Sequence, residues 1–261
     1  MIMSDPNNIN LSLMKGKKGV IMGVANDHSI AWGIAQSLSA AGAELAFSYQ
    51  SETLKKRVEP LAKMLGSDLI YPCDVESSED IEIFFNSIQN KWESIDFLVH
   101  AIAFSDKSEL KGPYYNTTKE NFIKTMLVSC FSFTEVVKEA QKIMISGGSI
   151  ITLTFDGANR VMPNYNVMGI AKAGLESSVR YLAADFGARG IRVNAISAGP
   201  MRTLAGGGIA DARAMFNFQK THSPLQKTVT LSDIGGSAIY LLSDLSAGVT
   251  GEVHYVDSGY N

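Results

Sequence analysis

The sequence predicts an α/β protein, namely a single doubly wound domain with a mostly parallel, seven-stranded sheet and helices on both faces. Two observations support this fold class. Short apolar runs rich in β-branched residues alternate with amphipathic stretches of helical periodicity along the 261 residues. No linker rich in proline, glycine or serine and no internal repeat interrupts the alternation, so we expect residues 1–261 to form one domain.

The expected elements follow from these patterns in chain order. Apolar, β-branched and aromatic residues predict strands at 20–22, 45–49, 73–75, 97–99, 149–154, 193–196 and 253–256. Amphipathic periodicity predicts helices at 29–41, 51–65, 79–92, 118–142, 164–188 and 231–243. Gly42 and Gly190 end two of these helices, and the segment after the sixth strand is predicted to be irregular. Right-handed crossovers would then place helices on both faces of the sheet.

Composition narrows the possible classes of protein. Hydrophobic residues make up 46% of the chain and charged residues 19%, which favours a folded core over disorder. The net charge of −3 gives no electrostatic reason to expect a nucleic acid partner. Two cysteines, Cys73 and Cys130, fit a reducing cytosol. Because neither a signal peptide nor an apolar run of about 18 residues is present, we expect a soluble, cytoplasmic protein without a membrane span.

A candidate nucleotide site follows the first predicted strand, since ligands of doubly wound sheets bind beyond the carboxyl ends of the strands. Gly23 would allow a sharp turn, Ser29 would cap the next helix, and Gly33 would allow close helix–strand packing. The helix N-terminus would offer N–H groups to a pyrophosphate. The full fingerprint G-x-G-x-x-G is absent, and a plain strand–helix turn would explain the same residues.

Two further residues extend this site. Gln50 ends the second strand, where the adenosine ribose would lie; being neutral, it does not exclude NADPH by charge. The basic run 55–57 would reach a 2′-phosphate, although a solvated basic helix face is the favoured interpretation. Asp74 ends the third strand, where a carboxylate would accept a hydrogen bond from the adenine amino group. No metal site is expected.

The candidate reacting centre is a tyrosine–lysine pair. Tyr165 and Lys172 are seven positions apart at the start of a predicted helix, which is close to two turns, so both side chains would point the same way. A nearby ammonium would lower the pKa of the phenol. The phenol would then donate a hydrogen bond to a carbonyl oxygen that gains negative charge.

These residues lie within longer motifs that carry a resemblance. The chain resembles the short-chain dehydrogenase/reductase superfamily and, within it, the NADH-dependent enoyl-acyl-carrier-protein reductases of bacterial type II fatty-acid synthesis. Tyr-x6-Lys, in place of the usual Tyr-x3-Lys, is typical of this branch. The matching stretches are 23–36, 42–50, 163–172, 192–205 and 244–253.

The resemblance implies a Rossmann domain that passes a hydride from NADH, with NADPH less expected, to the β-carbon of a trans-2-enoyl thioester on acyl carrier protein. It also implies a homotetramer whose faces are the helices at 118–142 and 164–188. The implied catalytic residues are Tyr165, Lys172 and Phe155. The implied cofactor contacts are Gly23, Ser29, Ile30, Gln50, Asp74, Val75, Ile102, Lys172, Met201 and Thr203. The implied substrate contacts are Phe104, Ser105, Tyr165, Ile209 and Phe216.

The chain departs from the family's pattern beside this centre. Phe155 stands where the family usually has a second tyrosine, so a hydroxyl is missing. If that hydroxyl acts in the transition state, its loss would cost about 10²–10³ in rate; if it only shapes the pocket, the cost is small. Asp156 replaces an expected apolar residue, and a solvated loop charge is its favoured interpretation.

Two segments are expected to be less regular. Residues 1–14 are predicted to form a loose polar arm. Residues 201–218, with three consecutive glycines, are predicted to form a mobile lid over the substrate. Ile209, Met215 and Phe216 would contact an acyl chain, and Arg202, Arg213 and Lys220 would meet an acidic carrier protein.

Two alternatives to an active enoyl reductase stay open. One is a reductase of ketones or 3-oxoacyl thioesters, which the Tyr-x6-Lys spacing argues against. The other is an NAD-binding protein that lost activity through Phe155.

Overall fold

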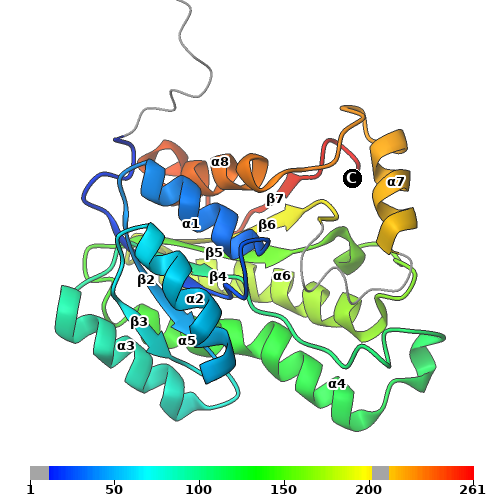
Figure 1. Cartoon of the computed structure of the whole chain (residues 1–261), viewed down its shortest axis with the longest axis horizontal. Coiled ribbons are helices and arrows are strands. Elements are labelled where there is room, and N and C mark those ends of the chain that lie inside the picture. Colours follow the sequence, from blue (N-terminus) through cyan, green and yellow to red (C-terminus); the bar gives the residue numbers. More distant parts are fainter. Residues whose placement is uncertain (1–11, 202–211) are drawn as a thin grey trace, which may run out of the picture.

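The sheet confirms the predicted fold class. The computed structural model describes residues 12–201 and 212–261, with the backbone only for residues 212–215. Within these residues seven strands form one sheet in the order β3-β2-β1-β4-β5-β6-β7, and all the pairings are parallel (Figure 1). The strands are β1 (Lys18–Met22), β2 (Glu44–Tyr49), β3 (Ile70–Pro72), β4 (Phe97–His100), β5 (Gly148–Thr154), β6 (Ile191–Ala198) and β7 (Val253–Val256).

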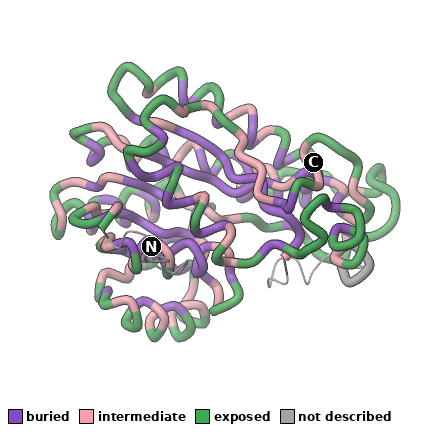
Figure 2. Tube along the Cα trace, turned by 90° about the horizontal axis from the view of Figure 1, so that it is seen from above, coloured by how far each residue is buried: buried purple, intermediate pink, exposed green. Residues whose placement is uncertain are grey.

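Helices cover both faces because side chains alternate along each strand. On one face α1, α2 and α8 share a core with Ile21 and Phe47; on the other α3, α5 and α6 pack against Val20 and Leu98. Figure 2 shows the buried strands between helices whose outer sides are exposed. The α-helices are α1 (Ile30–Ala40), α2 (Glu52–Met64), α3 (Ser78–Trp92), α4 (Lys119–Met126), α5 (Ser132–Ala140), α6 (Asn166–Gly187), α7 (Ala212–His222) and α8 (Leu231–Leu242).

The strand order reverses between β1 and β4. From β1 the chain first runs outward through β2 and β3, and it then returns to β4 on the other side of β1. The carboxyl ends of these two central strands are in register, since Met22 pairs with His100. Such a reversal of strand order is where doubly wound sheets bind ligands.

The prediction that the third strand spans 73–75 is wrong by a few residues. The strand is Ile70–Pro72, and residues 73–75 follow it. Pro72, which cannot donate a backbone hydrogen bond, is tolerated at the end of β3 because β3 is an edge strand, where one side needs no partner.

Two helical predictions also need correction. The predicted helix at 118–142 is interrupted by a π-helical turn, Leu127–Phe131, that separates α4 from α5. The segment after β6 was predicted to be irregular, yet it contains α7. The predicted arm at 1–14 lies mostly outside the described residues, as does much of the predicted lid at 201–218. Short 3₁₀ turns occur at Tyr114–Asn116, Asp156–Ala158 and Asp244–Ser246.

Candidate active site

The turn after β1 is tightly packed against the segment that follows β4. Gly23 has a φ of 105°, and a Cβ atom at this position would collide with the backbone carbonyl of Ala101. Only glycine therefore fits this turn without strain. Gly33 behaves differently from its prediction, because a Cβ there would lie 2.5 Å from Cβ of Leu231. It allows close packing of α1 against α8, a helix, and not against a strand.

Ser29 occupies the N-cap position of α1, but its hydroxyl does not cap the helix as predicted. Instead Oγ accepts hydrogen bonds from the backbone N–H groups of Ala25 and Asn26, at 3.0 and 3.1 Å. The loop before α1 turns back toward Ser29, so the N–H groups of this loop, and not those of the helix, reach Oγ. Ser29 therefore fixes the loop, and the first-turn N–H groups, beginning with Ile30, are not capped by it. A helix N-terminus of this kind attracts an anion such as a phosphate.

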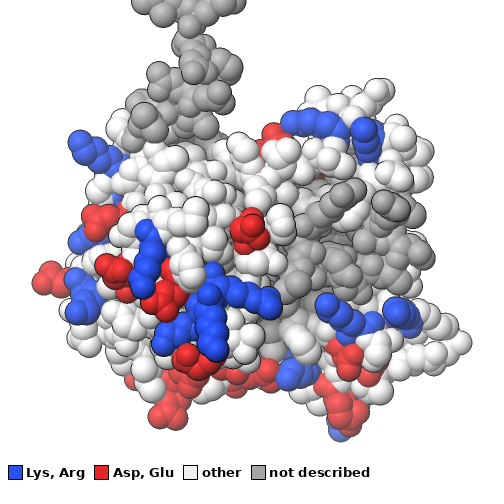
Figure 3. Space-filling view, viewed as in Figure 1, with Lys and Arg blue, Asp and Glu red and all other residues white. Residues whose placement is uncertain are grey.

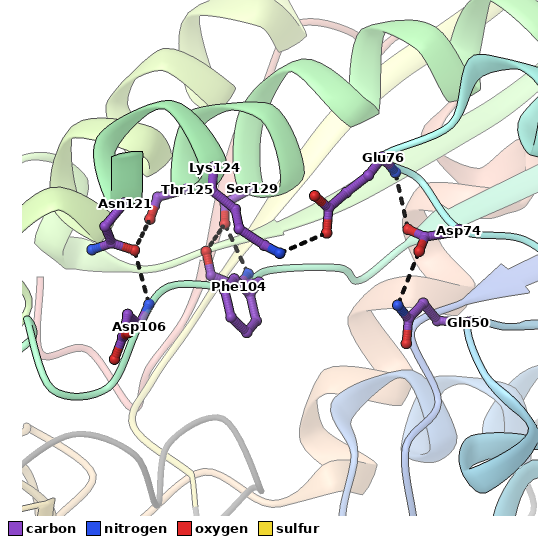
Figure 4. A network of polar contacts seen from close by, with 9 residues as sticks. All are labelled: Gln50, Asp74, Glu76, Phe104, Asp106, Asn121, Lys124, Thr125 and Ser129. Carbon is purple, nitrogen blue, oxygen red and sulfur yellow. Dashed lines mark hydrogen bonds and ion pairs between the residues drawn. The ribbon is translucent and has the colours of Figure 1, made fainter. Parts of the chain in front are cut away.

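The ends of β2 and β3 meet as expected. Nε2 of Gln50 donates to Oδ2 of Asp74 across 3.0 Å, and Oδ1 of Asp74 accepts from the backbone N–H of Glu76. Val75, which lies between Asp74 and Glu76 in the sequence, is buried. Gln50 and Asp74 are thus held next to each other at the carboxyl edge of the sheet (Figure 4).

The basic run on α2 is partly engaged. Nζ of Lys55 lies 3.7 Å from a carboxylate oxygen of Glu52 and 5.6 Å from the ring centroid of Tyr49. Figure 3 shows positive side chains gathered over α2 among carboxylates. This arrangement agrees with the interpretation of the run as a basic helix face. Cys73, after β3, is buried, and burial raises the pKa of its thiol to about 12, so it is not poised as a nucleophile.

Tyr165 and Lys172 are both buried, one at the N-cap of α6 and the other two turns along the helix. Their side chains are only 8% and 6% exposed. Both neighbours of Tyr165 in the sequence have left-handed backbones, with φ of 61° at Asn164 and 40° at Asn166. The chain therefore turns sharply around Tyr165 and directs its ring inward. Nζ of Lys172 donates to the backbone carbonyl of Leu153, near the end of β5, across 2.7 Å.

The acid–base properties of the pair differ from the prediction. Burial, and after it the negative charge of Glu176, raises the pKa of Tyr165 well above its usual range. The prediction that Lys172 lowers this pKa is therefore wrong, because burial disfavours the charged phenolate. Burial lowers the pKa of Lys172 to about 8. At neutral pH the phenol keeps its proton and can act as a hydrogen-bond donor.

Phe155 packs directly on Tyr165. The two ring centroids are 5.1 Å apart with the planes at 70°, an edge-to-face contact. This contact restrains the tyrosine ring from one side. The next residue, Asp156, was interpreted as a solvated loop charge, but it is 5% exposed. Among the described residues Oδ2 of Asp156 has no hydrogen-bond partner, and it lies 3.7 Å from Nε of Arg160. Burial raises the pKa of this carboxyl.

The loop after β4, which contains Ile102, Phe104 and Ser105, is anchored to α4 and to the π-helical turn (Figure 4). The hydroxyl of Ser129 accepts from the backbone N–H of Phe104 and donates to its carbonyl, both at 2.9 Å. Ser105 is buried, and the hydroxyl of Thr125 donates to it across 2.9 Å. The Phe104 ring is 46% exposed. Of the two predicted substrate residues, Phe104 is therefore open to a ligand, and Ser105 is turned into the protein.

Few of the predicted lid residues can be located. Met201 is half-buried just after β6, and Phe216 is half-buried on α7. Thr203 and Ile209 lie outside the described residues, as do Arg202 and the side chains of Arg213 and Met215. Lys220 is exposed on α7.

Sequence reasoning missed three residues that support the site: Glu176, Ser129 and Lys124. Glu176 is one helical turn beyond Lys172, so a carboxylate on the apolar side of α6 was a usable signal. Ser129 had no signal of its own because its role depends on the π-helical turn. Lys124 pairs with Glu76 at 3.1 Å and lies 5.1 Å from the Phe104 ring centroid, which only the fold brings together.

Neither a metal-binding cluster nor a membrane-spanning helix occurs in the described part of the chain. Residues 12–201 and 212–261 hold no cluster of His, Cys, Asp or Glu side chains suited to a metal ion. None of the helices described is both long enough and apolar enough to cross a membrane.

The sheet, the tight turn after β1 and the Tyr165–Lys172 pair define the class of short-chain dehydrogenase-type reductases. The family model for enoyl-(acyl carrier protein) reductase matches residues 23–261. The chain belongs to this family. A curated relative from Rhizobium meliloti, named enoyl-(acyl-carrier-protein) reductase (NADH) 2, is 66% identical over 95% of this chain and 93% of its own length.

Solved structures agree with this assignment. A crystal structure of FabI from Candidatus Liberibacter asiaticus has a TM-score of 0.94 and 60% identity, covering 96% of this chain and 97% of that one. The enoyl-(acyl-carrier-protein) reductase of Anaplasma phagocytophilum, solved in complex with NAD, has a TM-score of 0.91 and 54% identity over 95% and 93% of the two chains.

Proposed function

We propose that this protein reduces the carbon–carbon double bond of trans-2-enoyl thioesters carried by acyl carrier protein, with NADH as the hydride donor. The observation that carries the proposal is the buried Tyr165 at the start of α6, with Lys172 two turns further along the same helix. This spacing, on the helix after β5, is the feature that the family resemblance links to enoyl reduction.

The nucleotide would lie across the carboxyl edge of β1, β2 and β4. Gly23 lets the chain turn sharply against Ala101 as it leaves β1, and this turn leads to the N-terminus of α1. The uncapped N-terminus of α1, with Ser29 and Ile30, would hold the phosphates. Gln50, Asp74 and Val75 would bind the adenosine, and Ile102, Lys172, Met201 and Thr203 would line the nicotinamide half.

The residues around the nicotinamide would divide the chemistry between them. NADH, when bound, supplies the hydride that the β-carbon of the thioester receives. Tyr165 donates a hydrogen bond to the thioester oxygen, which gains negative charge as an enolate forms, and the α-carbon is then protonated. The neutral phenol suits this task because its raised pKa keeps the proton on oxygen. Lys172, charged below about pH 8, binds the ribose and keeps the local potential positive.

The acyl chain would contact the aromatic side of the site. Phe104, with its open ring, and Phe216 of α7 would form two walls, and Ile209 would contribute a third. Phe155 would act by packing on Tyr165. Because Phe155 lacks the hydroxyl of the family's usual tyrosine, the hydrogen bond to the oxyanion would come from Tyr165 alone. Ser105 would support the Phe104 loop from behind, through its contact with Thr125.

Exposed apolar side chains support the assembly that we propose, and the two cysteines support the cellular location. Large apolar side chains are exposed on the helices that the family uses for a homotetramer: Ile123 of α4 at 54%, Phe131 of the π-helical turn at 51%, Ile170 of α6 at 45% and Tyr181 of α6 at 75%. Such patches on helices are typical of subunit interfaces. The protein would act in the cytoplasm, since both cysteines are free and buried. Lys220 is the described residue of the basic set expected to meet the carrier protein.

Turnover measurements test the proposal. Purified protein is given NADH or NADPH with crotonyl thioester, and in a parallel series with acetoacetyl thioester, and nucleotide oxidation is followed by absorbance. We expect turnover of the crotonyl substrate with NADH, and a kcat about 10²–10³ lower for Tyr165→Phe. Turnover of the acetoacetyl substrate alone would identify a carbonyl reductase. Nucleotide binding without turnover of either substrate would identify an inactive NAD-binding protein.

A further inference from the structure

A second charged side chain is buried close to the candidate reacting centre. Glu176 lies on α6 one turn after Lys172, and each residue is only 6% exposed. Glutamate is almost never buried in proteins unless its carboxylate is paired or hydrogen-bonded. The position of Glu176 therefore needs an explanation that its helix alone does not provide.

The carboxylate of Glu176 joins three parts of the fold. Oε1 accepts a hydrogen bond from the hydroxyl of Thr154, the last residue of β5, across 2.7 Å. Oε2 accepts from Nδ2 of Asn159, in the loop that leads to Tyr165, across 3.4 Å. The same amide of Asn159 donates to the hydroxyl of Tyr255 on β7 across 3.2 Å. Glu176 thus ties α6 to the end of β5 and to the loop before Tyr165.

Two consecutive residues of β5 are held by this helix. Lys172 donates to the carbonyl of Leu153, and Glu176 accepts from the side chain of Thr154. The residue that follows is Phe155, whose ring packs edge-to-face on Tyr165. The contacts of α6 with β5 therefore fix the backbone from which the restraint on Tyr165 extends.

On this basis, which rests on the proposed function, we propose that Glu176 is a positioning residue of the reacting centre. It aligns the end of β5 with Tyr165, and it supplies the buried negative charge that keeps Lys172 in its ammonium form.

The electrostatic surroundings agree with this role. Burial lowers the pKa of Lys172, while Cys130 and Glu176 raise it, which opposes the loss of the proton. Cys130 is itself neutral near pH 7, because burial raises the pKa of its thiol. His100 of β4 also faces Lys172, but burial lowers its pKa to about 3, so it carries no charge there. Glu176 is therefore the carboxylate that acts on Lys172.

The charge of Glu176 also acts on two tyrosines, Tyr165 and Tyr255. Glu176 raises the pKa of Tyr165, after the larger effect of burial. Burial, and after it Glu176, also raises the pKa of Tyr255 on β7, whose other charged neighbours are Asp156, Arg160 and Asp257. Removal of the Glu176 charge would thus lower the pKa of both Lys172 and Tyr165, and both changes would move the alkaline limb of activity to lower pH.

The first test separates charge from hydrogen bonding with two variants. Glu176→Gln keeps an acceptor for Thr154 and removes the charge, and Thr154→Val keeps the charge and removes the hydrogen bond. The kcat/KM for crotonyl thioester with NADH is measured from pH 6 to 10. For Glu176→Gln we expect the alkaline limb to move down by about 0.5–1 unit, which makes its loss about three- to tenfold larger at pH 9 than at pH 6.5. For Thr154→Val we expect a lower kcat at all pH values and an unmoved limb.

A second charge variant covers the case in which Glu176→Gln does not fold. Asn159→Lys keeps a hydrogen-bond donor beside Glu176 and adds a positive charge at an exposed position, so it should move the alkaline limb to lower pH. An alkaline limb that stays in place in every folded charge variant would overturn the charge role. A wild-type kcat in Thr154→Val would overturn the alignment role. Both outcomes differ from failure of the proposed function, in which the wild-type protein itself does not turn over the enoyl thioester.

Discussion

Gly157 lies directly against the ring of Tyr165 in the candidate active site. A Cβ atom at Gly157 would lie 2.5 Å from Cδ1 and 2.8 Å from Cε1 of that ring, and 3.2 Å from Cδ1 of Phe155. Carbon atoms in contact are normally about 3.5–4.0 Å apart, so Gly157→Ala requires the tyrosine ring to move by about 1 Å. A displacement of that size at a reacting group costs about 10² in rate. We therefore expect kcat for the enoyl thioester to fall about a hundredfold.

The control for this prediction lies in the helix that carries the pair. A Cβ atom at Gly187, the last residue of α6, would meet no atom within 4 Å, so Gly187→Ala should retain the wild-type kcat. Circular dichroism and NADH binding by fluorescence would verify that both variants fold and bind nucleotide. A folded Gly157→Ala protein with a wild-type kcat would refute the reasoning, because it would show that the exact placement of the Tyr165 ring does not limit the reaction.

Three further predictions concern pH, packing and stability. Burial lowers the pKa of Lys172 to about 8, so its ammonium form is present below that pH. We therefore expect kcat/KM to fall about tenfold per pH unit above pH 8. An activity that stays unchanged to pH 10 would contradict this expectation. Phe155→Leu loses the edge-to-face contact with Tyr165, about 0.5–1.5 kcal/mol, so kcat should drop about two- to twelvefold, whereas Phe155→Tyr keeps the ring and should stay near wild type. Gly33→Ala forces α1 from α8 and should lower the free energy of unfolding in urea by about 1–3 kcal/mol, whereas Gly236→Ala, with open space, should be neutral or stabilising by about 1 kcal/mol.

Much of the fold could be predicted because its signals are local. The short apolar runs of β1 and β5 and the helical period of α3 and α8 are visible in single segments, and their bounds agree with the prediction within a few residues. The Tyr165–Lys172 pair could be predicted for the same reason, since both residues belong to one helix.

The features that escaped prediction depend on neighbours distant in the sequence. Asp156 is buried because the fold closes around its short turn, whereas its sequence context is that of a surface loop. The pKa of Tyr165 is raised, opposite to the expectation, because its ring is buried, which the Tyr-x6-Lys spacing does not reveal. Ser29 failed as a cap because the loop before α1 offers it two nearer donors. In each case a tertiary contact decided between two locally reasonable outcomes.

The π-helical turn between α4 and α5 also sets the rotational phase of the chain. A π turn holds one more residue than the corresponding α turn, and one residue of an α-helix corresponds to about 100° of rotation. Downstream of Leu127–Phe131, the side chains of Phe133, Val136 and Val137 face the sheet and are fully buried. Deletion of one residue from this turn would restore a continuous α-helix, and it would rotate that apolar stripe about a quarter of a revolution away from the core. The extra residue of this turn therefore lets consecutive helical segments contact the Phe104 loop on one side and the sheet on the other.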